Sequence, residues 1–231
     1  SHRMGCRYYV GEWKNEQYYP EHHAQMSWVD NTFFAPESLE DERGRRIMWA
    51  WLLDYRDLEA RLYQGWSGTL SLPRVLNLGK DGLLEIDIAE EIETLRYRHS
   101  RKTEITIQAE KKLYIQDVSG SSLELNLKLV TNNSLRVGIA VCVCESLGEE
   151  TRVTYDAQNN LLEVDTQKSG PMGSPKDIES APLNLQPEEV LELRIFIDRS
   201  VVEVFANKKQ AIARRIYPSK NNGMKIYLFS E

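Results

Sequence analysis

Hydrophobic and polar positions alternate along much of the second half of the chain. Residues 123–129, 135–143 and 191–197 place an apolar side chain at every second position, with mostly polar side chains between them. Because successive side chains of a β-strand point to opposite faces, each segment predicts a strand with one buried face. Further strands are predicted at 103–108, 152–155, 161–165, 201–206, 211–216 and 224–229. About nine strands at this density indicate a β-sandwich, with residues 166–189 as its one long loop.

The first half of the chain has shorter and more aromatic segments. Those at 30–38, 44–51 and 65–74 are separated by turn-forming or charged residues, which is typical of short strands. Strands are also predicted at 6–10, 68–78 and 83–88, a hairpin turn at Asn15-Glu16, and a charged connector at 54–59. Short aromatic strands repeated in this way suit the blades of a β-propeller.

A change of pattern separates the two halves. Ile88, Ile92 and Leu95 fall at helical spacing with acidic residues between them, which predicts a short helix or an ordered linker. We therefore expect a partial propeller over residues 1–90, a linker over 91–100 and a sandwich over 101–231.

The most apolar strand of the first half carries two tryptophans. A strand over 44–53 would place Trp49 and Trp51 on one face and Met48, Ala50 and Leu52 on the other. Tryptophan pairs usually fill cores, and their rings also stack on the apolar faces of sugars. Both interpretations stay open from the pattern alone.

Composition narrows the classes of function. With 231 residues, 41% of them hydrophobic and 28% charged, the chain is typical of a soluble globular protein. A net charge of −6 argues against nucleic-acid binding, which needs an excess of Lys and Arg.

No apolar run reaches the roughly 18 residues of a membrane span, and no targeting segment is recognised, so localisation is unassigned. The cysteines at 6, 142 and 144 include no C-x-x-C pair that could bind zinc, and we interpret them as small buried or half-buried thiols, which favours a reducing, cytoplasmic setting.

Metal and cofactor chemistry has little support in the sequence. His22-His23 lacks the spacing and the third ligand that a zinc site requires. We therefore predict no metal site and no cofactor.

A segment near the end of the chain resembles a sequence motif of a known family. Residues 193–207, in which Asp198-Arg199-Ser200 would form a hairpin turn, closely resemble the C-terminal sandwich signature of glycoside hydrolase family 32, the β-fructofuranosidases. Four further segments resemble sequence motifs of that family and occur in the same order as in the family, namely 33–38, 45–51, 65–74 and 164–170. The resemblance implies an all-β fold: the C-terminal blades of a five-bladed β-propeller followed by a β-sandwich.

The family's catalytic segments do not match this chain. The resemblance implies a retaining mechanism, with acids in Asn-Asp-Pro-Asn, Arg-Asp-Pro and Glu-Cys segments, and none of these occurs here. Retention requires two carboxyl groups about 5–5.5 Å apart. Arg56-Asp57 is followed by Leu58, and Cys144-Glu145 has the reverse order. We therefore assign no catalytic residue, expect the catalytic carboxylates upstream of Ser1, and expect the chain alone to be inactive.

Two substrate-binding positions can be transferred from the family. Phe34 matches a tyrosine and Trp51 a tryptophan that border the family's fructose pocket, although Phe34 lacks the hydroxyl group. For Glu37 a role in the pocket is weighed against a hydrogen-bonded turn, and the turn is favoured because isolated carboxylates are usually surface groups.

The hypothesis from the sequence is a fragment of a retaining hydrolase of β-fructofuranosides such as sucrose, fructo-oligosaccharides, levan or inulin. A blade takes about 40–45 residues, so residues 1–90 provide two blades at most. The expected partners are a fructose-containing sugar and either the missing N-terminal half of the propeller or another copy of the chain. The alternative is a non-catalytic module, a glycan-binding or structural β-sandwich.

Overall fold

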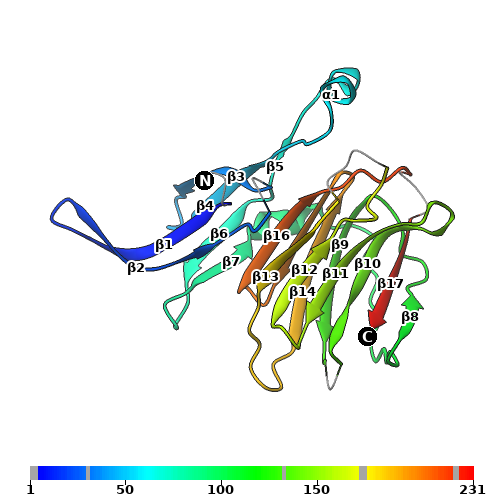
Figure 1. Cartoon of the computed structure of the whole chain (residues 1–231). Helices are drawn as coiled ribbons and strands as arrows, with labels where there is room; N and C mark the ends of the chain where they lie inside the picture. Colours follow the sequence, from blue (N-terminus) through cyan, green and yellow to red (C-terminus); the bar gives the residue numbers. More distant parts are fainter. Residues whose placement is uncertain (1–4, 30–31, 132–133, 172–175, 221–223) are drawn as a thin grey trace.

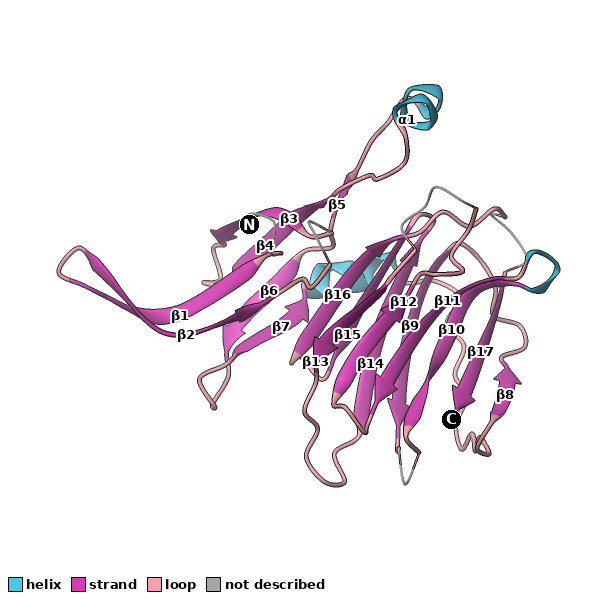
Figure 2. Cartoon of the chain, viewed as in Figure 1, coloured by secondary structure: helices cyan, strands magenta, loops and turns pink. Residues whose placement is uncertain are grey.

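The computed structural model describes residues 5–29, 32–131, 134–171, 176–220 and 224–231 and consists mainly of β-strands (Figures 1 and 2). The first part holds β1 (Arg7–Lys14), β2 (Gln17–Gln25), β3 (Phe34–Glu40), β4 (Arg46–Leu52), α1 (Leu58–Gln64), β5 (Thr69–Leu70), β6 (Arg74–Leu78), β7 (Leu84–Ile88) and the 3₁₀ helix η1 (Glu90–Leu95). The second part holds β8 (Lys111–Tyr114), β9 (Ser122–Leu129), β10 (Arg136–Cys144), η2 (Glu145–Leu147), β11 (Glu149–Asp156), β12 (Leu161–Asp165), β13 (Ile178–Pro182), β14 (Leu191–Asp198), β15 (Val201–Ala206), β16 (Gln210–Arg215) and β17 (Lys225–Ser230).

The second part is a two-layered β-sandwich, as the alternating pattern predicted. One sheet has the order β13-β12-β11-β10-β17-β8, and the other has the order β16-β15-β14-β9. The apolar residues of both sheets form one buried core, which includes Ile139, Val153, Ile195 and Val204. The predicted hairpin of β14 and β15 is confirmed, with Arg199 and Ser200 between the paired residues Asp198 and Val201.

The first part contains an antiparallel sheet and a separate hairpin. The sheet has the order β3-β4-β6-β7, and β5 adds to β4. The hairpin of β1 and β2 extends away from the rest of the molecule (Figure 1). Its turn lies at Asn15 and Glu16, as predicted, and both residues have positive φ angles (50° and 62°), which a tight two-residue hairpin turn requires.

Strands β15 and β16 of the four-stranded sandwich sheet are buried on both faces. Val202 and Val204 of β15 point into the sandwich core, while Val201 and Phe205 join a second apolar cluster with residues of the N-terminal sheet. This explains why every residue of β15 is buried. The sandwich therefore acts as the support on which the N-terminal sheet rests.

The connector predicted at 54–59 is partly helical. Helix α1 begins after Asp57, whose side chain accepts a hydrogen bond from the backbone N–H of Ala60, and it ends at Gly65 in the left-handed conformation. These are ordinary N-cap and C-cap residues. The sequence did not predict this helix. None of its residues is buried, so it has no apolar face that a helical periodicity of hydrophobic residues could indicate.

Two strand predictions and one loop prediction also need correction. Residues 103–108 form no strand, and β8 lies slightly later. The predicted loop 166–189 contains β13, in which Glu179 and Ala181 are the buried residues, so a buried carboxylate hid the apolar alternation. The strand predicted at 68–78 is interrupted between β5 and β6, a segment that includes Pro73, which has no N–H to donate.

The helical turn predicted after residue 88 is confirmed as η1. The domain boundaries at 90 and 100 stay a prediction. Among the described residues, no helix is both long and apolar enough to span a membrane.

An ion-pair cluster fastens the segment after η1 to the sandwich, and it leads to a pH prediction. Glu124 of β9 accepts hydrogen bonds from Arg96 and Arg194, each at 2.7 Å. The bond from Arg96 is the main cause that lowers the pKa of Glu124 from 4.5 to about 2. A lowered pKa stabilises the fold above the unfolded value and loses that effect as the pH falls through the folded value. Stability should therefore decrease between about pH 4.5 and 2.

We expect Glu124→Gln to cost about 1 kcal/mol at pH 7, a value reduced for the partial exposure of Arg96. In urea unfolding, the variant should also lose less stability than the wild type between pH 4.5 and 3. Glu192→Gln is the matched control, because Glu192 is an exposed residue of the neighbouring strand β14. Identical pH profiles for Glu124→Gln and the wild type would contradict the assignment.

Candidate functional site

Strand β4 presents the two sequence-predicted site residues at one edge of the N-terminal sheet. Met48, Ala50 and Leu52 are buried, whereas Trp51 is 43% exposed, so the predicted alternation is confirmed. Phe34 of β3 lies opposite Trp51 in the strand register. Their ring centroids are 6.4 Å apart in an edge-to-face arrangement. The structure therefore brings Phe34 and Trp51 together, and their role in sugar binding stays a prediction.

A β-bulge precedes the next register pair. The register of β3 against β4 shifts between Phe34 and Glu37, and Ala35 has a positive φ of 45°. Bulges change the direction of neighbouring side chains, and proline is tolerated at them because it has no N–H to donate. Pro36 occupies this bulge. Glu37 is exposed and pairs in register with Trp49.

Gly68 lies against the indole of Trp51. Its φ is +70°, and a methyl group added there would fall 1.9 Å from Trp51 Nε1. Only glycine allows this close approach in this backbone conformation. Residue 68 thus sets where the Trp51 ring can lie.

Residues 53–68 form an arm that leaves β4, carries α1 and returns to β5. Figure 1 shows α1 at the far end of the arm, away from both sandwich sheets. At the base of the arm, Asp54 accepts hydrogen bonds from Arg56 Nη2 and from the Tyr217 hydroxyl, both at 2.6 Å. Burial alone would raise the pKa of Asp54, but these hydrogen bonds outweigh it and hold the pKa well below its usual value.

Two guanidinium groups lie against two aromatic rings at this base. The Arg56 guanidinium carbon is 4.5 Å from the centroid of Trp66 and 4.7 Å from that of Tyr217. The same carbon of Arg215 is 5.1 Å and 5.3 Å from these centroids. Stacking of arginine on aromatic faces is attractive. We name Asp54, Arg56, Trp66, Arg215 and Tyr217 the arm-base cluster. The sequence did not reveal it because its residues come from two segments, 54–66 and 215–217, that are far apart in the chain.

Two buried carboxylates outside this cluster form ion pairs with buried arginines. The buried Glu179 and Glu203 each form an ion pair with a buried arginine, Arg214 and Arg74 respectively. Where the chain is described, no three His, Cys, Asp or Glu side chains are grouped so that they could hold a metal ion. His23 stacks on Tyr9 with centroids 5.4 Å apart.

Comparisons with known proteins match both parts of the chain. The family described as "Glycosyl hydrolases family 32 N-terminal domain" matches residues 2–86, and "Glycosyl hydrolases family 32 C terminal" matches residues 91–231. The chain is 29% identical to a sucrose-6-phosphate hydrolase of Zymomonas mobilis, over 93% of this chain and 42% of that protein. It is 29% identical to the levanase of Bacillus subtilis, over 96% of this chain and 35% of that protein. The chain thus spans about two fifths of the length of these relatives.

Solved structures show the same fold. Fructan 1-exohydrolase IIa from Cichorium intybus superposes with a TM-score of 0.81 at 21% identity, over 96% of this chain and 51% of that one. Sucrose-6-phosphate hydrolase from Lactobacillus gasseri superposes with a TM-score of 0.72 at 21% identity, over 97% of this chain and 47% of that one. The predicted architecture, propeller strands followed by a sandwich, is confirmed.

Proposed function

This chain belongs to glycosyl hydrolase family 32, and from that membership we propose that it is part of a retaining hydrolase of β-fructofuranosides. The observation that carries the proposal is the match to both family domains in the family's order. Named relatives act on sucrose 6-phosphate and levan. A β-linked fructosyl group is the chemistry that these substrates share.

In this proposal, Phe34 and Trp51 form one apolar wall of the fructose pocket. Their edge-to-face contact leaves the Trp51 ring 43% exposed, and an exposed aromatic ring can pack on the C–H groups of a sugar. Phe34 contributes ring surface without a hydroxyl group, so it offers no hydrogen bond to the sugar.

The acid chemistry must come from other residues. A retaining mechanism uses a carboxylate nucleophile and a carboxylic acid on opposite sides of the scissile bond. The three acidic segments of the family are absent from this sequence. We infer that polypeptide outside these 231 residues supplies the catalytic carboxylates and the remaining blades, and that the sandwich supports the pocket wall.

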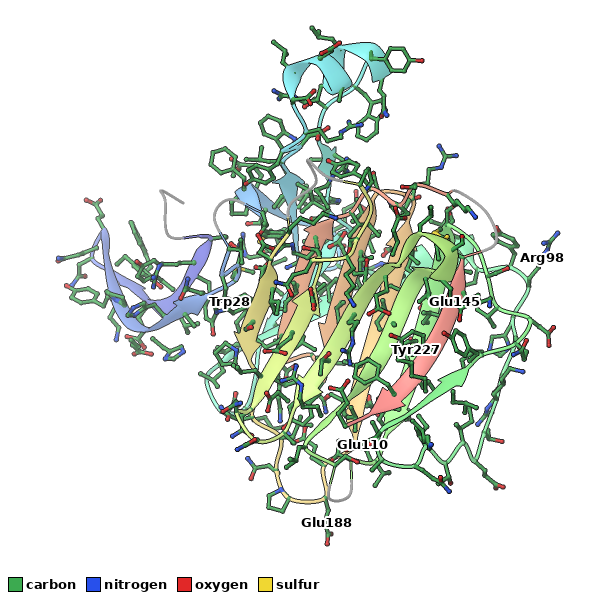
Figure 3. The ribbon with its side chains drawn as sticks, turned by 45° about the vertical axis from the view of Figure 1, so that its right-hand side comes forward. Trp28, Arg98, Glu110, Glu145, Glu188 and Tyr227 are labelled. Carbon is green, nitrogen blue, oxygen red and sulfur yellow. The ribbon has the colours of Figure 1, made fainter. Side chains whose placement is uncertain are left out.

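The alternative of a non-catalytic glycan-binding module has weaker support. Within the described part of the chain, every exposed aromatic side chain lies before Arg98. On the six-stranded sheet, Tyr227 (Figure 3) is only 1% exposed, and Lys112 lies over its ring at 4.4 Å. A buried ring cannot stack on a sugar, so the described residues of the sandwich present no exposed aromatic ring to a glycan.

The test compares this chain alone with a chimaera in which the N-terminal part of the Zymomonas mobilis relative precedes it. Release of fructose from sucrose, levan and inulin is measured for both proteins. We expect activity from the chimaera only. Activity of the 231-residue chain alone would contradict the inferred origin of the carboxylates, and a folded but inactive chimaera would contradict the hydrolase proposal.

A further inference from the structure

The arm of residues 53–68 is packed at its base and exposed at its tip. Helix α1 at the tip buries none of its residues, and Leu62 and Tyr63 are 72% and 90% exposed (Figure 1). At the base, in contrast, the side chain of Asp54 is fully buried. The position of the arm therefore depends on the contacts at its base.

Arg56 links the two limbs of the arm. It belongs to the limb that leaves β4, where its Nε and Nη2 donate to the Asp54 carboxylate at 2.9 Å and 2.6 Å. Its Nη1 donates to the side-chain oxygen of Gln64, on the limb that returns to β5. Its guanidinium also lies over the ring of Trp66, two residues further along that limb. A shift of Arg56 would therefore move both limbs.

Tyr217 connects this base to the sandwich. It follows the end of β16 by two residues, its hydroxyl donates to Asp54, and its ring lies against the Arg56 guanidinium. Arg215, the last residue of β16, donates through Nε to the same hydroxyl and lies against the Trp66 ring. One tyrosine thus binds the outgoing limb with its hydroxyl and stacks on the cation that holds the returning limb.

The returning limb reaches the proposed wall of the fructose pocket formed by Phe34 and Trp51, which we call the sugar-binding wall. Gly68 lies two residues after Trp66, at most about 7 Å along the chain, and packs against the Trp51 indole. On its other side, β5 begins at the next residue and pairs with β4. Gly68 is therefore held by the sheet on one side and by the arm-base cluster, through Trp66, on the other.

We propose that Tyr217 is a positioning residue for substrate binding: it fixes both limbs of the arm through Asp54 and Arg56, and thereby keeps Gly68 against the Trp51 ring. The proposal rests on the proposed function, which assigns the contact with the sugar to this ring. Tyr217 acts through other residues and is not itself a catalytic residue. Because it belongs to the C-terminal part of the chain, the sandwich takes part in aligning the sugar-binding wall.

The first test uses the 231-residue chain and needs no catalysis. Tyr217→Phe removes the hydrogen bond to Asp54 and keeps the ring that stacks on the guanidinium groups. NMR of protein isotope-labelled at its five tryptophans records the indole N–H signals, and Trp51→Phe and Trp66→Phe assign the two that matter. We expect Tyr217→Phe to shift the signals of Trp66 and Trp51 and to leave that of Trp13, near the tip of the β1–β2 hairpin, unchanged. An unchanged Trp51 signal would overturn the proposal.

The second test measures steady-state kinetics on sucrose in the chimaera. A wall that packs on the C–H groups of the sugar binds substrate and transition state alike, so its displacement raises KM and leaves kcat nearly unchanged. We expect Tyr217→Phe to raise KM about tenfold, because a hydrogen bond to a charged group is lost. A variant that was only less stable would instead show a lower kcat at an unchanged KM, since less of the protein is folded. That result would assign Tyr217 a structural role and overturn the proposal.

Tyr114→Phe is the matched control for both tests. The Tyr114 hydroxyl donates to Glu145 at 2.6 Å, the same length as the bond from Tyr217 to Asp54. Tyr114 belongs to β8, at the edge of the sandwich sheet that does not contain β16. We expect this variant to keep the wild-type Trp51 signal and KM. Equal changes in Tyr114→Phe and Tyr217→Phe would show that the effect is not specific to the arm base, and would overturn the proposal.

The proposal and the proposed function can fail separately. A Trp51 signal that shifts in Tyr217→Phe, together with a chimaera that releases no fructose, would support the positioning of Trp51 by Tyr217 and reject the hydrolase. An active chimaera whose KM is the same with and without Tyr217→Phe would leave the proposed function standing and reject the positioning role.

Discussion

Replacing Glu203 with glutamine is expected to destabilise the protein by about 3–5 kcal/mol, the usual effect of removing one partner from a buried ion pair. Glu203 of β15 is 2% exposed and Arg74 of β6 is fully buried, with 3.2 Å between Oε2 and Nη2. The Arg74 guanidinium also lies over the Phe33 ring at 4.0 Å. Among the described residues Arg74 forms no other ion pair, so without the carboxylate the cation would remain buried and unpaired there.

The design of this variant isolates the charge. Glutamine keeps a carbonyl oxygen that can accept the hydrogen bond that Glu203 Oε1 receives from the Leu72 N–H at 2.6 Å. Equilibrium unfolding in urea measures the loss. As control, the double variant Arg74→Met with Glu203→Leu removes both charges and should be more stable than Glu203→Gln alone. A loss below about 1 kcal/mol for Glu203→Gln would show that the pair does not hold the two parts together.

This ion pair also connects the sandwich to the candidate site. Leu72 lies between β5 and β6, and β5 pairs with Trp51 through Leu70. Glu203 therefore fixes the segment that places β5 beside Trp51. A sandwich residue far from the sugar-binding wall in sequence thus helps to position that wall.

Sequence patterns predicted the parts of this fold that depend on local periodicity. The sandwich strands, the β14–β15 turn and the two faces of β4 follow from side-chain alternation, which a single chain displays directly. The juxtaposition of Phe34 and Trp51 follows from the resemblance of their segments to one family. The first three features depend on residues that are close together in the chain. The fourth depends on an arrangement of residues that the family is already known to have.

The features that could not be predicted depend on contacts between distant residues. Glu203 and Arg74 are 129 positions apart, and Tyr217 and Asp54 are 163 apart. In the sequence, Glu203 is a polar position within an apolar strand, which indicates a solvent-exposed face, and only packing of a second sheet buries it.

Gly68→Ala is expected to lower kcat/KM for sucrose about 100-fold in the chimaera, the loss that a displacement of about 1 Å near a reacting substrate can produce. The added methyl group would lie 1.9 Å from Trp51 Nε1. The indole must therefore move, and with it the proposed wall of the fructose pocket. The positive φ of +70° adds a backbone cost of about 1 kcal/mol.

Gly82→Ala is the matched control for this experiment. Gly82 has a similar φ of +77°, but a methyl group added there meets nothing within 4 Å. The two variants therefore share the backbone cost and differ in the contact with Trp51. Steady-state kinetics on sucrose should show nearly wild-type activity for Gly82→Ala and the large loss for Gly68→Ala alone. If both variants kept similar kcat/KM values, Trp51 would not be part of the substrate-binding wall.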